Sequence, residues 1–224
     1  MLRDNISRIK ERIVLACEKN NRGSEEIVVV AVSKGRPAEQ IKEAIAAGIT
    51  DIGENRVQEA LVKYQGLWEI RWHMIGHLQT NKVKDAVKIF DLIQSVDSLR
   101  LAAEIDRQAV KISKVQDVLV EIKTSSEATK FGLLPEEAMA ALEEIAELKN
   151  INIKGLMTIA PLADEPEKAR PYFRMLRELR DEINALGITP YPLPVLSMGM
   201  TDDFTVAVEE GSTMVRLGRA IFGS

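Results

Sequence analysis

Short runs of β-branched and other apolar residues recur along the chain, and each is followed by a stretch with the apolar spacing of a helix. Such alternation is typical of parallel βαβ units, in which each helix returns the chain to the start of the next strand. Eight strands in a chain of 224 residues favour a closed (β/α)8 TIM barrel over an open sheet, and we expect one domain, residues 1–224. The predicted strands are residues 27–33, 48–53, 70–76, 90–96, 115–122, 153–160, 194–198 and 213–218.

The helical stretches carry ordinary start signals. Residues 2–19 form an amphipathic stretch before the first strand, so we predict an extra N-terminal helix in addition to the eightfold pattern. Its apolar stripe also contains Cys17, the only cysteine, which we interpret as a buried small hydrophobe. Ser98 or Asp97 can cap one helix, and Pro135 followed by two glutamates can open another.

Composition narrows the class of protein. Hydrophobic residues make up 46% of the chain and charged residues 29%, which is enough to bury a sizeable core. The 30 basic and 34 acidic residues give a net charge of −4, and together with the few aromatic side chains this argues against a nucleic-acid partner. The single cysteine, the absence of a hydrophobic signal core and the lack of any run of about 20 apolar residues predict a cytoplasmic protein without a membrane partner.

The first predicted strand runs directly into Lys34. Because side chains alternate between the two faces of a strand, Lys34 is expected on the face of Val30 and Val32, at the end of the barrel where active sites lie. A lysine at the end of a buried strand loses hydration, which favours the neutral amine, and a neutral amine attacks aldehydes to form a Schiff base. The alternative is a lysine whose ammonium group reaches solvent.

Two glycine-containing turns follow the last two predicted strands. Ser197 and Gly199 precede Thr201, where a helix is expected to begin, and Gly218 follows the last strand. Glycine lets backbone N–H groups approach an anion, and the loops after strands seven and eight are the recurrent phosphate site of this fold. Either these glycines serve tight turns only, or they hold a phosphate opposite Lys34, as a phosphorylated aldehyde such as pyridoxal 5′-phosphate (PLP) requires.

Arg216 lies two residues before Gly218 and is expected on the same face of the last strand. One interpretation is an ion pair at the barrel rim with Glu209 or Glu210. The other is a partner for the pyridine nitrogen of PLP. A permanently charged arginine disfavours a protonated pyridine, so it would hold the cofactor without making it a strong electron sink.

Three further polar residues lie near predicted strand ends. Asn55 follows the second strand and either contacts a ligand or starts the next helix. His73 and His77, the only histidines, straddle a strand end and its turn. Since no cysteine or carboxylate cluster completes a ligand set with them, we expect no metal site.

Long segments of the sequence allow a more specific comparison. In chain order they resemble the PLP homeostasis protein family, the proline synthetase co-transcribed homologues, and the resemblance extends over nearly the whole chain. LSMGMTDDF and EEGSTMVRLG are the most specific of these segments. The others are IVVVAVSKGRP, DIGENRVQEA, RWHMIGHLQTNK, TKFG and GLMTIA.

The resemblance implies a fold like the N-terminal barrel of alanine racemase, with PLP held as a Schiff base on Lys34. It also implies a ring contact near Asn55, Arg216 at the pyridine nitrogen, and a link between Lys130 and cofactor exchange. Threonine is most common in the family where this chain has Arg219, so one phosphate-binding hydroxyl is missing here. The implied phosphate contacts are Ser197, Gly199 and the turn formed by Gly218 and Arg219, and Met200 is a further expected cofactor-binding residue.

Three functional hypotheses follow. The first is a monomeric PLP carrier or regulator in PLP homeostasis, which is not an ordinary enzyme and supplies PLP-dependent apo-enzymes. The second is a PLP-dependent amino-acid racemase of related fold, although such racemases need a second base and no tyrosine lies at a predicted strand end. The third, an aldolase-like barrel that uses Lys34 on a phosphorylated sugar, is disfavoured by the family segments.

Overall fold

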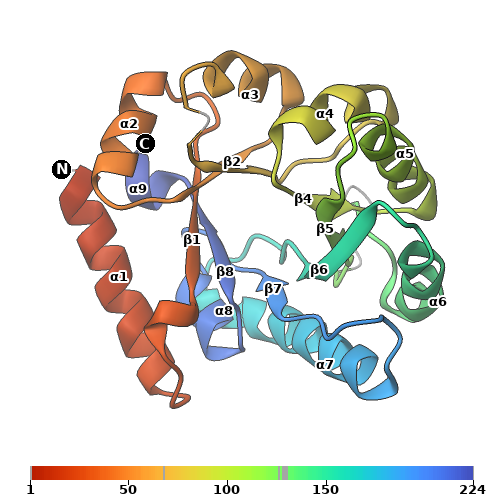
Figure 1. The fold of residues 1–224 in the computed structure, drawn as a ribbon. Helices are drawn as coiled ribbons and strands as arrows, with labels where there is room; N and C mark the ends of the chain where they lie inside the picture. Colours follow the sequence, from red (N-terminus) through yellow and green to blue (C-terminus); the bar gives the residue numbers. More distant parts are fainter. Residues whose placement is uncertain (1, 68, 126, 128–130, 224) are drawn as a thin grey trace.

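In the computed structural model, which describes residues 2–67, 69–125, 127 and 131–223, eight parallel strands pair in chain order. The eighth strand pairs with the first and closes the barrel (Figure 1). The predicted (β/α)8 TIM barrel is therefore confirmed. The strands are β1 (Val28–Val32), β2 (Asp51–Glu54), β3 (Arg71–Met74), β4 (Leu92–Val96), β5 (Gln116–Glu121), β6 (Ile151–Met157), β7 (Val195–Ser197) and β8 (Met214–Leu217).

Helices lie around the outside of the barrel (Figure 1). They are α1 (Leu2–Glu18), α2 (Ala38–Ala46), α3 (Val57–Tyr64), α4 (Val83–Ile89), α5 (Leu99–Val110), α6 (Pro135–Ala146), α7 (Arg170–Leu186), α8 (Phe204–Glu209) and α9 (Arg219–Phe222), with short 3-10 turns η1 (Ser24–Glu26), η2 (Thr80–Lys82) and η3 (Pro166–Ala169). The predicted extra helix is α1, which packs against α8 and α9 and buries Cys17. Within the described ranges, no helix combines the length and the apolar character that a membrane span requires.

The helix-start signals act as predicted. The Ser98 hydroxyl oxygen accepts a hydrogen bond from the Leu101 backbone N–H at 3.3 Å and caps α5. Pro135 is the first residue of α6, where a missing N–H leaves no helical hydrogen bond unmade.

Strand boundaries differ from the predicted ones by up to three residues. β2 begins at Asp51 rather than at residue 48, because Gly48 adopts a φ of +92° in the turn after α2. β6 begins two residues earlier than predicted, because Asn152 interrupts the apolar run although it lies within the strand. The Asn152 side chain donates a hydrogen bond to Asp117 of the neighbouring β5 at 2.7 Å, which explains a polar residue at this position.

The inside of the barrel is filled by a small apolar cluster, separate from the larger core between strands and helices. This layer occupies the space at mid-height, so the barrel is a packed core and not a pore. Its buried members are Val30, Leu92, Leu119, Met157 and Met214.

Candidate functional site

The barrel interior becomes polar toward the carboxyl ends of the strands. Because strand side chains alternate, a residue two positions after a member of the apolar layer also points inward. Gln94, Glu121 and Arg216 occupy such positions on β4, β5 and β8, and all three are buried. Burying polar and charged groups is costly unless they are paired, so this layer is the first candidate for function.

Arg216 is 4% exposed and is held by two neutral groups. Its guanidinium donates hydrogen bonds to Ser197 Oγ at 2.6 Å and to the Thr158 backbone carbonyl at 2.8 Å. Burial lowers the pKa of Arg216 to about 10, against the opposing effect of the Glu121 and Asp203 carboxylates. At neutral pH this side chain therefore remains a buried cation.

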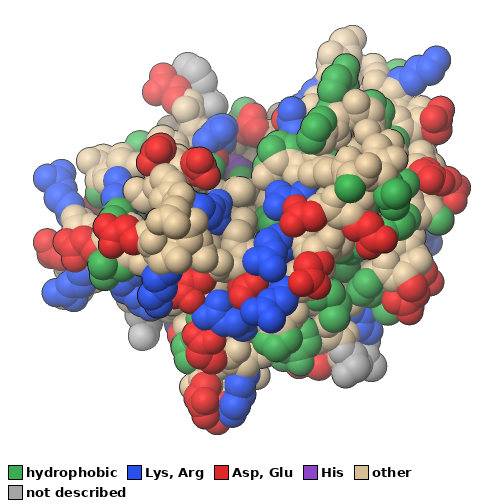
Figure 2. Space-filling model, turned by 90° about the horizontal axis from the view of Figure 1, so that it is seen from below, with side chains coloured by type: hydrophobic (Ala, Val, Ile, Leu, Met, Phe, Trp, Pro, Cys, Tyr) green, Lys and Arg blue, Asp and Glu red, His purple; other side chains and the backbone are tan. Residues whose placement is uncertain are grey.

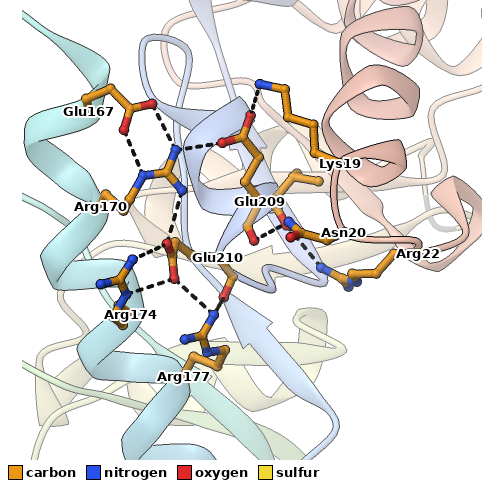
Figure 3. A network of polar contacts seen from close by, with 10 residues as sticks. Lys19, Asn20, Arg22, Glu167, Arg170, Arg174, Arg177, Glu209 and Glu210 are labelled. Carbon is orange, nitrogen blue, oxygen red and sulfur yellow. Dashed lines mark hydrogen bonds and ion pairs between the residues drawn. The ribbon is translucent and has the colours of Figure 1, made fainter.

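The ion pair suggested for Arg216 with Glu209 or Glu210 is wrong. Both glutamates lie outside the barrel at the end of α8, where they bind basic residues of α7 and α1 (Figure 3). Seen from below, basic and acidic side chains are interleaved on the face that α7 and α8 contribute to (Figure 2). The contacts of the two glutamates are with Lys19, Arg170, Arg174 and Arg177.

Lys34 lies in a turn and is exposed to solvent. The strand β1 ends at Val32, and the Arg36 backbone N–H donates to the Ser33 carbonyl at 2.9 Å, while Gly35 adopts a φ of +68°. Lys34 is exposed in this turn, so the expectation of a desolvated lysine is wrong for this conformation. Lys34 lines a cavity of about 730 Å³ at the carboxyl ends of β1 to β3.

A buried ion pair fixes the turn that carries Lys34. The Lys63 ammonium group, from α3, donates to the Ser33 carbonyl at 2.6 Å, to Glu54 at 2.6 Å and to Glu59 at 2.7 Å. Glu54 also accepts from the Ser33 hydroxyl at 2.5 Å, and Glu59 accepts from the Gly35 backbone N–H at 2.6 Å. Residues on both sides of Lys34 are thus anchored, while its own side chain is left exposed.

The other side of the same turn contacts the last residues of the barrel. The Arg36 guanidinium donates to the Gly223 carbonyl and lies over the Phe222 ring, 5.8 Å from its centroid. The Lys34 turn and the turn after β8 therefore lie on the same rim of the barrel.

The turn after β7 brings α8 close to the sheet. Gly199 adopts a φ of +95°, and a Cβ there would lie 2.5 Å from the Ala207 Cβ. The Met200 backbone N–H donates to Asp203 Oδ1 at 2.6 Å, so that group is already paired. The tight-turn interpretation thus accounts for Gly199, whereas a phosphate contact from Gly199 or Met200 stays a prediction.

The turn after β8 has backbone donors available. The backbone N–H groups of Gly218 and Arg219 have no hydrogen-bond partner among the described residues. The Arg219 side chain donates to Asp202 Oδ2 at 2.6 Å and so joins the turn after β8 to the turn after β7. Its charge is therefore already balanced, and Arg219 can contribute to an anion site through its backbone.

Asn55 lies beside the barrel mouth and does not cap a helix. The N-cap of α3 is Arg56 and has no side-chain cap, so the helix-start interpretation of Asn55 is wrong. Asn55 lines a cavity of about 270 Å³ together with His77, Glu121 and Lys123. A Cβ on Gly76 would lie 2.6 Å from the Asn55 carbonyl oxygen, so a glycine is needed here.

With this geometry established, comparison with known proteins identifies the family. The model of the alanine racemase N-terminal domain matches residues 2–224. A pyridoxal phosphate homeostasis protein from Aquifex aeolicus (strain VF5) is 47% identical over 222 residues, which cover 98% of this chain and 96% of that protein. One from Escherichia coli (strain K12) is 38% identical over 226 residues, which cover 98% and 95%. This chain belongs to the pyridoxal phosphate homeostasis protein family.

Solved structures agree with this assignment to the family. PipY of Synechococcus elongatus PCC7942 with PLP bound is similar with a TM-score of 0.87 and 34% identity, and the match covers 100% of both chains. An alanine racemase from Clostridium difficile 630 in complex with cycloserine is similar with a TM-score of 0.79 at 20% identity. It matches all of this chain but 59% of that protein, so this second likeness shows the fold alone.

Several polar residues of this family member were missed by the sequence reasoning. Glu121 is the last residue of β5 and Lys123 lies two residues beyond it, and charged residues at the end of an apolar strand were a signal that could have found them. His77 stacks on the Phe131 ring with centroids 3.8 Å apart, which no sequence pattern indicates. The predicted exchange residue Lys130 lies outside the described residues.

Proposed function

We propose that this chain binds PLP covalently through Lys34 and serves PLP homeostasis by holding and releasing the cofactor. The observation that supports this most strongly is the buried cation Arg216, which has no carboxylate within hydrogen-bond distance among the described residues. It lies on β8, the strand that leads into the turn on the same rim as Lys34. When bound, PLP supplies an aldehyde carbon that an amine can attack and a pyridine ring whose nitrogen accepts a hydrogen bond.

The donor set fits a phosphorylated pyridine aldehyde. Lys34 provides an accessible amine, and Arg216 provides N–H donors that stay charged at neutral pH. The free backbone N–H groups of Gly218 and Arg219 suit a phosphate. The aldehyde, the pyridine nitrogen and the phosphate of PLP thus each have a partner group in the protein. The Lys34 amine must turn inward from its exposed position to reach the aldehyde.

We propose further that the bound cofactor is not used for sustained catalysis. A charged arginine beside the pyridine nitrogen disfavours its protonation, and a neutral ring withdraws electrons weakly. Within this chain the usual second base of a racemase also has no counterpart among the tyrosines. Tyr64 packs on Trp72 outside the barrel, Tyr172 lies in α7, and Tyr191 is exposed before β7.

The racemase alternative gives a clear test. Purified protein is titrated with PLP while its visible absorption is followed, and the loaded protein is then assayed with L-alanine and other amino acids. We expect uptake of one PLP per chain and no racemisation. Turnover above about 1 per second, an ordinary enzymatic rate, would favour the racemase, and failure to take up PLP would refute the proposal altogether.

We also propose that the protein acts as a monomer in the cytoplasm and that PLP-dependent apo-enzymes receive its cofactor. The described helices pack on the barrel, and the large exposed apolar side chains are scattered over several elements. Native mass spectrometry tests the monomer. Activation of an apo-enzyme by the loaded protein, faster than by the same amount of free PLP released from it, tests direct transfer.

A further inference from the structure

A continuous chain of buried hydrogen bonds crosses the barrel interior from β2 to β8. We call its members, Asp51, His73, Gln94, Ser197 and Arg216, the interior relay. Asp51 Oδ1 lies 2.9 Å from His73 Nε2, and His73 Nδ1 lies 2.8 Å from Gln94 Nε2. Gln94 Oε1 accepts from the Ser197 hydroxyl at 2.6 Å, and Ser197 Oγ accepts from Arg216 at 2.6 Å.

With the Gln94 amide oriented as in the structure, the chemistry of these groups fixes the direction of every bond in the relay. An arginine can only donate, so Ser197 Oγ accepts from Arg216 and must give its single proton to Gln94 Oε1. The Gln94 amide then donates one hydrogen to His73 Nδ1 and the other to Met214 Sδ at 3.1 Å. His73 therefore keeps a lone pair on Nδ1 and donates from Nε2 to Asp51.

The far end of the relay is anchored at the opposite rim of the barrel. Asp51 Oδ2 accepts from the Thr50 hydroxyl at 2.6 Å and from the Arg71 guanidinium at 2.9 Å. Burial acts to raise the pKa of Asp51, but the hydrogen bonds from His73 and Thr50 outweigh it and the pKa is lowered. Asp51 is therefore ionised and accepts hydrogen bonds only, which holds His73 in one orientation.

The fold does not need five hydrogen-bonded polar side chains inside the barrel. The neighbouring interior positions are apolar, and a barrel can be filled by aliphatic side chains throughout. The relay instead buries five polar side chains in series, and the group at its end is the cation that faces the proposed cofactor site. Buried networks in which every member is satisfied fix a single side-chain arrangement.

On this basis, and resting on the proposed binding of PLP, we propose that Gln94, His73 and Asp51 are positioning residues for Arg216. They orient the Ser197 hydroxyl so that it accepts from the guanidinium, and so hold Arg216 in place for the pyridine nitrogen. The same chain commits the Ser197 proton to Gln94, so Ser197 can donate to a phosphate only if it gives up Gln94.

The first test needs no cofactor. Nitrogen-15 NMR of uniformly labelled, PLP-free protein reports which ring nitrogen of each histidine carries the proton, and His77→Asn assigns the remaining signals to His73. We expect His73 to carry its proton on Nε2 and to keep a lone pair on Nδ1, as its contacts with Asp51 and Gln94 require. A proton on Nδ1, or a doubly protonated ring at neutral pH, would overturn the inferred direction of the relay.

The second test reverses one bond in the relay. In Gln94→Glu the side chain can no longer donate to His73, so the histidine must donate from Nδ1 and gains a second proton. Gln116→Glu is the matched control, because Gln116 is also a fully buried strand glutamine whose amide donates, but only to the backbone carbonyls of Phe90, Asp91 and Asp117.

For Gln94→Glu we expect PLP dissociation to become about tenfold faster, the lower end of what outer-shell partners contribute at metal sites, with a changed pH titration of the bound-PLP absorption. Gln116→Glu is expected to lower thermal stability but to leave both readouts as in wild type. Equal effects of the two variants, or no effect of Gln94→Glu, would refute the positioning role. If wild type takes up no PLP, the proposed function itself fails, which the titration reveals separately.

Discussion

The arginines of α7 and the arginine of β8 lie in contrasting environments. On α7, Arg170, Arg174 and Arg177 point outward and bind carboxylates, and Glu210 alone contacts all three (Figure 3). Inside the barrel, Arg216 has no carboxylate within hydrogen-bond distance among the described residues, only a hydroxyl and a backbone carbonyl. The outer arginines are exposed by 25% to 52%, whereas Arg216 is buried.

This difference separates a structural role from a functional one. The outer pairs join α7 to the end of α8, and Lys19, directly after α1, binds Glu209, so these pairs hold three helices together at little desolvation cost. A cation in the interior costs free energy that weak neutral partners do not repay. We interpret Arg216 as a group retained for a ligand, and substitutions of inner and outer residues test this interpretation.

The largest effect is expected from Lys34→Ala. Because the amine is the proposed point of attachment, the variant should lose covalent PLP completely. Its free energy of unfolding should stay within about 0.5 kcal/mol of wild type, since the side chain is exposed. Lys82→Ala is the control, because Lys82 lines the same cavity as Lys34. Absorption spectra and urea unfolding measure both, and unchanged attachment in Lys34→Ala would show that another lysine carries PLP.

The second-largest effect is expected from Arg216→Ala, which should weaken the retention of PLP. Loss of hydrogen bonds from a charged donor is worth about 1.5–3 kcal/mol, so PLP should dissociate roughly 10 to 150 times faster. Arg177→Ala, which removes an arginine of the outer network, should leave PLP retention unchanged. Dissociation into a PLP-scavenging apo-enzyme measures both rates. Equal PLP retention in the two variants would contradict a role for Arg216 in PLP binding that the outer arginines lack.

Glu121 should make the stability of the protein depend on pH. Burial raises its pKa to about 7, although the Arg216 charge opposes this. A carboxyl whose pKa is higher in the folded than in the unfolded state destabilises the fold as pH rises from about 4.5 to 7. Glu121→Gln should therefore gain up to about 3 kcal/mol at pH 8 and close to nothing near pH 4.5. Urea unfolding at both pH values checks this, and an equal gain at both would contradict the raised pKa.

The smallest effect is expected from Arg174→Ala. This arginine is 52% exposed, and Glu210 keeps Arg170 and Arg177 when it is lost. Exposed ion pairs contribute about 0.2–1 kcal/mol, so the free energy of unfolding should fall by no more than that. Thermal unfolding measures the loss. A loss above about 2 kcal/mol would mean that breaking the outer network costs as much stability as breaking a buried ion pair.

Much of the fold could be predicted from the sequence, because each buried strand is a short apolar run between turn residues. All eight strands and the extra helix α1 were found in this way, and Ser98 and Pro135 marked helix starts. Errors arose where a strand carries a polar residue that is paired across the sheet, as Asn152 is with Asp117. Such pairing depends on a neighbouring strand and leaves no local pattern.

The site was predicted less completely, for the same reason. Arg216 was singled out from its place two residues before a glycine turn, but its partners come from β7, which contains Ser197, and from Thr158 directly after β6. Gln94 and His73 were not recognised as a chain, since their contact requires the closed barrel. Periodicity also placed Lys34 on the inner face of a strand, whereas β1 ends at Val32 and Lys34 is an exposed residue of the following turn.

A crystal structure of the protein soaked with PLP tests the central claim most directly. We expect continuous density from Lys34 Nζ to the aldehyde carbon of the cofactor, with the Arg216 guanidinium within hydrogen-bond distance of the pyridine nitrogen. An unmodified Lys34 that still points into bulk solvent, or PLP attached to Lys82 or Lys123, would contradict the account.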